Sequence, residues 1–245
     1  MKTKLLSILL IGGLLFGNSA KAQNMAGGEN PKNVVKLNLF ALAFTNFSLQ
    51  YERVFNEKTS GALGFSVMPS RNLPSSLSSD PILAKTTLSD WSITPEFRWY
   101  PGTKKGAPHG FYLAPYLRYS STSILMPFDF TETSGAITTY KIDANYSGFG
   151  GGVMLGAQWL INEKFSIDWW ILGGHYGSGS ASVAMKADFS ALSATDRAKL
   201  ETDLNGIAIP VGTIKSTISN SEAKIDISSL PYFGVRSGLT IGWAF

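Results

Sequence analysis

Apolar and polar residues alternate along much of the chain, and this period of two is the pattern of β-strands. In the segment 46–55, Phe47, Leu49 and Tyr51 share one face, and polar residues occupy most of the other. All the large apolar residues of 233–245 stand at odd positions. The pattern predicts eight strands, at 33–43, 46–55, 60–68, 89–100, 110–121, 145–159, 165–175 and 230–245.

The connections between these segments fall into two classes of length. Those at 56–59, 101–109 and 161–164 are short and polar, whereas those at 69–88, 122–144 and 176–229 are long. The connection near Phe44 is the exception: it lies on the same side as the long connections but is itself short. Alternating short and long loops, with strands of about 10 residues tilted by about 45°, are typical of membrane barrels. We therefore predict an all-β, eight-stranded antiparallel up-and-down transmembrane β-barrel with extended outer loops.

The longest connection, 176–229, is predicted to contain structure of its own. Ser193-Ala194-Thr195-Asp196 resembles a capping box, so a short helix is expected from there to Leu204. Partial alternation at 182–187 and 215–227 predicts strand extensions above the membrane, and 124–143 could extend in the same way.

Aromatic residues gather near both ends of the predicted strands. The group at the periplasmic ends comprises Phe55, Trp99, Tyr100, Phe111, Trp159, Phe165, Trp243 and Phe245. The group near the outer ends comprises Phe47, Trp91, Tyr119, Tyr176 and Tyr232. Two such girdles place amphipathic rings at the level of lipid headgroups. We therefore expect contacts with outer-membrane lipids.

The N-terminal segment has the three parts of a secretory signal peptide. Met1-Lys2-Thr3-Lys4 is followed by an apolar run to Phe16 and then by Ser19-Ala20-Lys21-Ala22, so cleavage is expected after Ala22. The predicted organisation is a signal peptide at 1–22, a short periplasmic segment at 23–32 and one barrel domain at 33–245. The expected location is the outer membrane of a Gram-negative bacterium.

Composition and charge narrow the classes of function. The signal peptide contains three lysines and no acid, so its removal lowers the formal net charge from +4 to +1. A basic patch for nucleic acid is therefore not expected. The chain has no cysteine, which excludes disulfides, thiolate metal sites and a lipid-modified N-terminal Cys. We expect no cofactor and no metal.

Three short stretches resemble a known family. They are NVVKLN at 33–38, SLQYER at 48–53 and PEFRWY at 95–100, and the likeness extends over most of the mature chain. In order and spacing they resemble a family of uncharacterised bacterial outer-membrane barrels, catalogued as a domain of unknown function and similar in architecture to small OmpA- and OmpX-type barrels. The resemblance implies fold and location only. The ending Trp243-Ala244-Phe245 also looks like the signal that the barrel assembly machinery reads, through Trp243 and Phe245.

The face opposite the aromatic residues carries charge. If this face points inward, the interior contains Lys36, Glu52, Glu96, Arg98, Arg118, Asp168 and Arg236. An eight-stranded barrel has room only for its own side chains, and buried charges must pair. A network of ion pairs that plugs the lumen is the expected arrangement. An ion or proton path along the same residues is the alternative.

Other residues offer weaker candidates for chemistry. His175, followed by Ser178 and Ser180, could form a hydrolase site at the outer rim if a carboxylate joined them, whereas His109 lies in a turn. The run 148–152 contains four glycines but lacks the setting of a phosphate-binding loop. With Gly156, its inward glycines are expected to make room for bulky residues such as Trp170 or Arg118.

The expected function is that of a non-enzymatic outer-membrane protein, with a structural role or a surface role carried by its long outer loops. An unknown extracellular or envelope partner would bind those loops. The alternatives are a narrow channel or small-solute transporter, a lipid-modifying enzyme at the rim, and a soluble secreted barrel around a ligand. The soluble barrel would require apolar residues inside and polar residues outside.

Overall fold

The computed structural model describes residues 31–72, 85–102, 106–131, 137–186, 188–190, 194–195, 198, 202 and 213–245. The predicted signal peptide and most of the segment 23–32 lie outside this part. The elements are β1 (Asn33–Asn38), α2 (Leu39–Ala43), β2 (Phe47–Asn56), β3 (Thr59–Asn72), β4 (Thr87–Trp99), β5 (Gly110–Thr131), β6 (Ile137–Ile161), β7 (Phe165–Lys186), β8 (Thr213–Ile218) and β9 (Glu222–Ala244).

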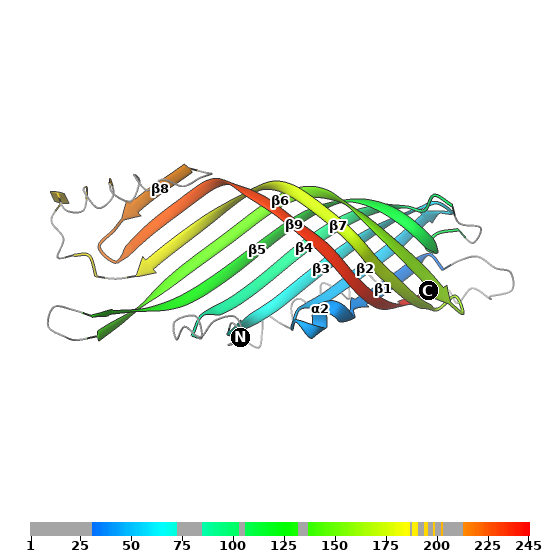
Figure 1. The fold of residues 1–245 in the computed structure, drawn as a ribbon, viewed down its shortest axis with the longest axis horizontal. Coiled ribbons are helices and arrows are strands. Elements are labelled where there is room, and N and C mark those ends of the chain that lie inside the picture. Colours follow the sequence, from blue (N-terminus) through cyan, green and yellow to red (C-terminus); the bar gives the residue numbers. More distant parts are fainter. Residues whose placement is uncertain are drawn as a thin grey trace, which may run out of the picture.

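The strands form one antiparallel sheet that closes on itself. From β1 to β7 each strand pairs with the next along the chain, and β9 pairs with β7 on one side and with β1 on the other. Figure 1 shows the long strands wound obliquely, with β8 at the end opposite the C-terminus. The predicted all-β class and up-and-down order are confirmed. Among the described residues the sheet has nine strands rather than eight, because β8 adds to the extended part of β9.

The first predicted strand, 33–43, is wrong beyond Asn38. Leu39 to Ala43 form the short helix α2, and the Asn38 side chain caps it by accepting a hydrogen bond from the Ala41 backbone N–H at 3.0 Å. The five residues are apolar without alternation, and leucine and alanine favour helix. The helices of the described residues are all too short or too polar to cross a membrane.

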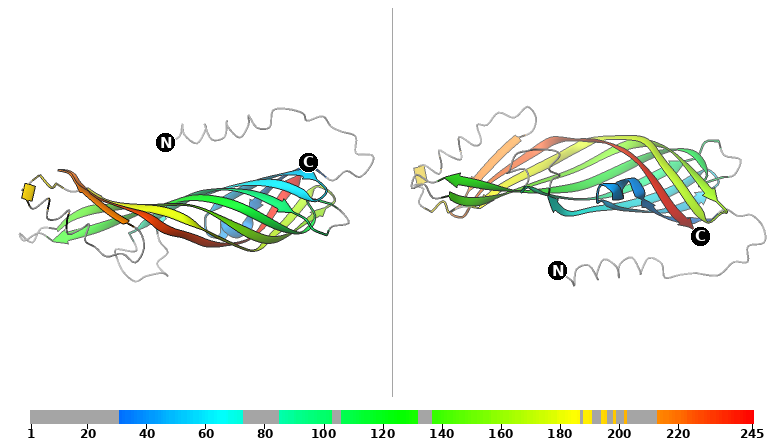
Figure 2. Two further views of the ribbon diagram at one scale, coloured as in Figure 1. Left: turned by 90° about the horizontal axis from the view of Figure 1, so that it is seen from above. Right: turned by 60° about the horizontal axis from the view of Figure 1, so that its bottom comes forward.

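The predicted long loop at 122–144 is largely strand, and so is most of the part of 176–229 that the structure describes. The β5–β6 ladder continues without a break to the pair Thr131↔Ile137, and β7–β9 continues to Lys186↔Glu222. In both views of Figure 2 these strands project as a curved ribbon beyond the closed ring. The expected extensions at 182–187 and 215–227 are therefore present in most of their length. The expected helix at 193–204 lies mostly outside the described residues.

The distribution of side chains is the reverse of that in a water-soluble protein, with apolar residues outside and polar residues inside. Large apolar side chains such as Phe97, Leu155 and Trp169 are exposed on the outside of the ring. Charged and amide side chains such as Lys36, Arg98 and Gln158 are buried inside. Two of the predicted girdle aromatics are wrong in orientation: Tyr100 and Tyr232 are buried in the interior. Their parity is that of the inward-facing residues of their strands.

The inward glycines of β6 do not give space to Trp170 or Arg118: Gly148 and Gly156 lie against tyrosine rings, and Gly150 and Gly152 lie against the backbone of β7. A Cβ on Gly156 would overlap the Tyr112 ring, and one on Gly148 would overlap the Tyr232 ring near its base. We expect Gly148→Ala to lower the free energy of unfolding by about 1–3 kcal/mol, because the Tyr232 ring is packed and cannot swing aside.

The matched control for this substitution is Gly174→Ala. A Cβ at Gly174, on the neighbouring strand β7, would meet no atom within 4 Å. Urea-induced unfolding of both variants in detergent, followed by tryptophan fluorescence, measures the difference. Equal midpoints for the two variants would contradict the close packing of Tyr232 against β6.

Candidate functional site

The interior of the ring holds a cluster of charged side chains centred on Lys36 and Arg98. The Lys36 ammonium donates to Glu52 Oε2, to Asp168 Oδ2 at 2.7 Å and to Gln158 Oε1 at 2.9 Å. These donors and acceptors come from β1, β2, β6 and β7. The closed ring therefore brings together residues that are up to 132 positions apart in the chain.

Arg98, on β4, joins three carboxylates. Its Nη1 lies 2.8 Å from Asp168 Oδ2 and 3.5 Å from Glu52 Oε2, and its Nη2 lies 2.9 Å from Glu96 Oε2. The guanidinium also lies over the Tyr112 ring, 4.5 Å from its centroid. Charge-assisted hydrogen bonds of this kind are about twice as strong as neutral ones. Arg98 is thus held in a single orientation by its neighbours.

Arg236, on β9, extends the cluster toward the end of the ring that carries the strand extensions. Its Nη1 donates to Glu96 Oε1 at 2.9 Å. The guanidinium lies 4.8 Å from the ring centroids of both Tyr116 and Trp170. Six of the seven predicted interior charges are therefore connected, namely Lys36, Glu52, Glu96, Arg98, Asp168 and Arg236. Three are positive and three negative, so the connected cluster is formally neutral.

The seventh residue, Arg118, is separate from the cluster. Its Nη1 donates to Thr94 Oγ1 at 3.1 Å, and it forms no ion pair with any residue that the structure describes. The sequence prediction grouped Arg118 with the others because inward parity alone does not say at which height along the ring a side chain ends. Its partner in the β5–β6 register is Gly150, well above the level of Asp168.

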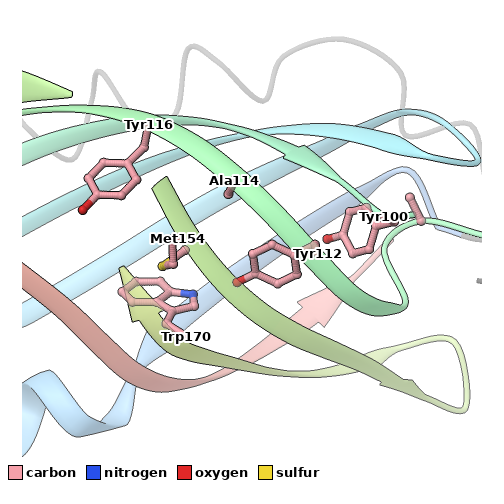
Figure 3. Close-up of a cluster of buried hydrophobic side chains, with 7 residues drawn as sticks. Tyr100, Tyr112, Ala114, Tyr116, Met154 and Trp170 are labelled. Carbon is pink, nitrogen blue, oxygen red and sulfur yellow. The ribbon is translucent and has the colours of Figure 1, made fainter. Parts of the chain in front are cut away.

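Neutral side chains complete the cluster, and the prediction from charge alone missed them. The Tyr100 hydroxyl donates to Glu52 Oε1 and the Tyr112 hydroxyl to Asp168 Oδ1, both at 2.8 Å. Gln50 Oε1 accepts from Arg98 Nη2 at 2.8 Å. Figure 3 shows the rings of Tyr100 and Tyr112 side by side inside the sheet. Inward parity was the signal that could have identified these residues.

The charged side chains at the centre of the cluster are shielded from solvent, and this limits their possible chemistry. The side chains of Lys36, Glu52, Arg98 and Asp168 have no solvent contact. Isolated charges in such a place would cost several kcal/mol each, and this cost is offset only when every charge is paired and hydrogen-bonded. The geometry meets that condition. A group that exchanges ions or protons needs solvent access, which these four side chains lack.

His175 lies above the cluster, and its Nδ1 faces a tyrosine hydroxyl rather than a serine. Its Nδ1 is 3.2 Å from the Tyr116 hydroxyl, and its ring centroid is 4.9 Å from that of Tyr232. A nucleophile–base pair would require a serine hydroxyl in the place of the tyrosine. No three His, Cys, Asp or Glu side chains gather as metal ligands within the described ranges.

The predicted C-terminal signal residues lie at the seam of the ring. Trp243 faces outward and packs edge-on against Phe165, with ring centroids 4.9 Å apart. The backbone of Phe245 exchanges hydrogen bonds with Asn33 in both directions at 2.9 Å. The last residue of the chain thus joins the end of β9 to the start of β1.

The strand extensions carry a hollow of about 640 Å³ between β5, β6, β7, β8 and β9. Its lining is rich in hydroxyls and includes Tyr146, Ser180, Lys215 and Asp226. A hydrogen bond from Lys224 lowers the pKa of the Asp226 carboxyl, so this acid is ionised at neutral pH. The hollow offers polar contacts and charges of both signs to a partner.

Comparison with protein families gives a match over most of the chain. The family model described as a protein of unknown function (DUF3575) matches residues 8–196. No curated protein and no solved structure matches the chain.

Proposed function

This chain belongs to the family of proteins of unknown function DUF3575, and we propose that it is a β-barrel protein of the bacterial outer membrane with a plugged lumen. Its role is non-enzymatic: the ring anchors the protein, and the strand extensions present a polar surface outside the cell. Outer-membrane lipids surround the ring, and a partner in the medium or the envelope binds the extensions.

The inverted distribution of side chains carries this proposal. Leu113, Leu155 and Leu239 point outward and are between 36% and 53% exposed, while Lys36, Glu52 and Asp168 point inward and are at most 1% exposed. In water, such an outer surface would be a large apolar patch. In a bilayer it is the required surface, because the solvent is hydrocarbon and the closed ring leaves few backbone groups unpaired.

The height of the apolar surface along the strands matches the thickness of the hydrocarbon layer of a membrane. On β5 the outward aromatic residues Phe111 and Tyr119 bound a stretch of about 9 residues, and on β6 Phe149 and Trp159 bound about 11. A membrane-spanning strand has about 9–11 residues. Beyond these limits the same faces become polar, with Ser121 and Ser147 directly paired. The extensions therefore begin where the bilayer would end.

The central experiment is expression in a Gram-negative host, followed by membrane fractionation and gel electrophoresis with and without heating. We expect the protein in the outer-membrane fraction and a faster band in the unheated sample, because a closed β-ring resists unfolding by detergent. Recovery in the soluble fraction, with no shift in mobility on heating, would contradict the membrane location.

Planar-bilayer recordings of the purified protein test the plugged lumen. We expect no stable conductance, because the buried ion pairs among Lys36, Glu52, Arg98 and Asp168 leave no solvent-accessible path at their level. A large and persistent open conductance would contradict the plug and favour a channel instead.

A further inference from the structure

The wall of the ring is incomplete near its outer end. β1 has 6 residues, whereas β9 has 23, and their pairing ends at Asn38↔Thr240. The next partner of β9 on this edge is β8, which begins to pair at Ser228. On the other edge of the opening, the pairing of β1 with β2 ends at Leu37↔Leu49, so Phe47 and Ser48 of β2 have no partner residue in β1. Residues 229–239 of β9 therefore face a lateral opening in the hydrogen-bonded wall.

The helix α2 contacts both edges of this opening, β9 and β2. A cavity of about 170 Å³ lies next to it, and Ala41 of α2 is one of its lining residues. In Figure 1, α2 follows β1 at the lower edge of the ring. The cavity lining combines outward residues, Phe65 and Val235, with interior ones, Trp170 and Arg236. Val235 is 73% exposed and Trp170 only 5%. The cavity thus connects the outer surface of the ring with its interior.

The charge of the cavity is positive. Arg118 and Arg236 line it, and no acidic residue does so among the residues that the structure describes. Glu96 neutralises Arg236 through their ion pair. Arg118 has no such close ion pair among the described residues: it donates to Thr94 and interacts with Tyr232, and Asp90 is the acid whose charge it feels. Desolvation of a charge without a close counter-ion is costly. An anion next to Arg118 would remove this cost.

One neutral donor near the cavity also lacks a partner. The Nε2 group of Gln50 is buried and forms no hydrogen bond. It lies 3.9 Å from the position that a Cβ on Gly64 would occupy, and Gly64 lines the cavity. The hydroxyls of Ser48, Ser66 and Thr94 line the same space. The Oδ1 atom of Asn46, which lines the cavity, is also buried without a partner. Buried polar atoms are almost always satisfied, so unsatisfied amide groups at and near the cavity indicate that a polar group from outside the protein belongs there.

We propose that this opening binds the anionic headgroup of a membrane amphiphile, a phosphate or carboxylate, with Arg118 as its main ligand. The hydrocarbon chain leaves sideways past Phe65 and Val235 into the outer leaflet. The cavity is large enough for a headgroup and too small for a long acyl chain, which is why the chain must remain outside. The inference rests on the proposed membrane location.

The test uses the full protein in a non-ionic detergent and native mass spectrometry with dodecyl phosphate as the probe. We expect one bound molecule per chain. Arg118→Gln should raise the dissociation constant about tenfold or more, because a charge-assisted contact is lost. Arg118→Lys, which keeps the charge, should have a smaller effect. Lys186→Gln, which removes a positive charge from an exposed position on the extension that lines neither cavity, is the matched control and should leave binding unchanged.

A second variant addresses the cavity without changing any charge. Ser48→Trp would fill much of the space and should abolish binding of dodecyl phosphate. Equal affinity in the wild type, Arg118→Gln and Ser48→Trp would overturn the proposal. Dodecanol binding as tightly as dodecyl phosphate would overturn the anion site. Inorganic phosphate binding as tightly would assign the site to a dissolved anion and overturn the lateral route.

Failure of this inference is distinguishable from failure of the proposed function. The change of gel mobility on heating, measured for every variant, reports whether the closed ring has formed in detergent. A protein that shows this change and fractionates with the outer membrane, yet binds no dodecyl phosphate, would retain the proposed function and lose the binding site.

Discussion

Asp168→Ala is expected to lower the free energy of unfolding by about 3–5 kcal/mol, the loss typical of breaking a buried ion pair from one side. Asp168 accepts hydrogen bonds from Lys36, Arg98, Tyr112 and Trp170, at 2.7, 2.8, 2.8 and 3.2 Å. Its removal leaves two positive charges with fewer acceptors, in a place without solvent. The formally neutral cluster would then carry a net charge of one.

The matched control is Asp226→Ala on the strand extension. Asp226 also pairs with a lysine, Lys224, at 2.9 Å, but its side chain is 47% exposed. Exposed ion pairs contribute about 0–1 kcal/mol, so a small loss is expected. Urea-induced unfolding in lipid vesicles, followed by tryptophan fluorescence, measures both variants. A loss for Asp168→Ala no larger than that for Asp226→Ala would show that the interior is hydrated rather than sealed.

Leu155→Arg is the substitution that separates a membrane from water as the solvent of the outer surface. Leu155 faces outward on β6 and lies between the aromatic residues Phe149 and Trp159. In a bilayer, an arginine near the midplane of a β-barrel costs about 2–4 kcal/mol. In water, exchanging a half-exposed surface residue changes stability by about 0.5 kcal/mol at most. We expect the larger loss.

Ser147→Arg provides the control on the same strand and the same face. Ser147 lies beyond Phe149, where the outward positions are already polar, so the loss should be close to zero. Both variants are unfolded by urea from lipid vesicles and compared with the wild type. If Leu155→Arg and Ser147→Arg unfold at the same urea concentration as the wild type, the apolar surface does not face hydrocarbon.

Much of the sheet could be predicted because strand parity is a local property. The side chains of an extended backbone point alternately to opposite faces, so Glu52, Arg98 and Asp168 could be assigned to one face without knowledge of their neighbours. The same rule, applied to polar residues without charge, would have included Gln50 and Tyr112. Tyr100 and Tyr232 were assigned to the aromatic girdles because their position near strand ends outweighed their parity.

The length of the strands was harder to predict. From Ser120 to Ser123 the residues of β5 are polar on both faces, so the amphipathic signal of a membrane strand is interrupted. The ladder nevertheless continues, because β6 offers an antiparallel partner in uninterrupted register. β1 is shorter than its sequence suggests. Apolar residues continue past Asn38, but Asn38 caps a helix there and the strand ends.

The sequence by itself determined the class of fold, the faces of the strands and the charges of the interior, since these follow from local alternation of polar and apolar side chains. The tertiary structure alone decided which acid meets which base, because that depends on the register and stagger of strands far apart in the chain. It also decided that β1 ends early and that Arg118 stands outside the ion-pair cluster, beside an opening in the wall.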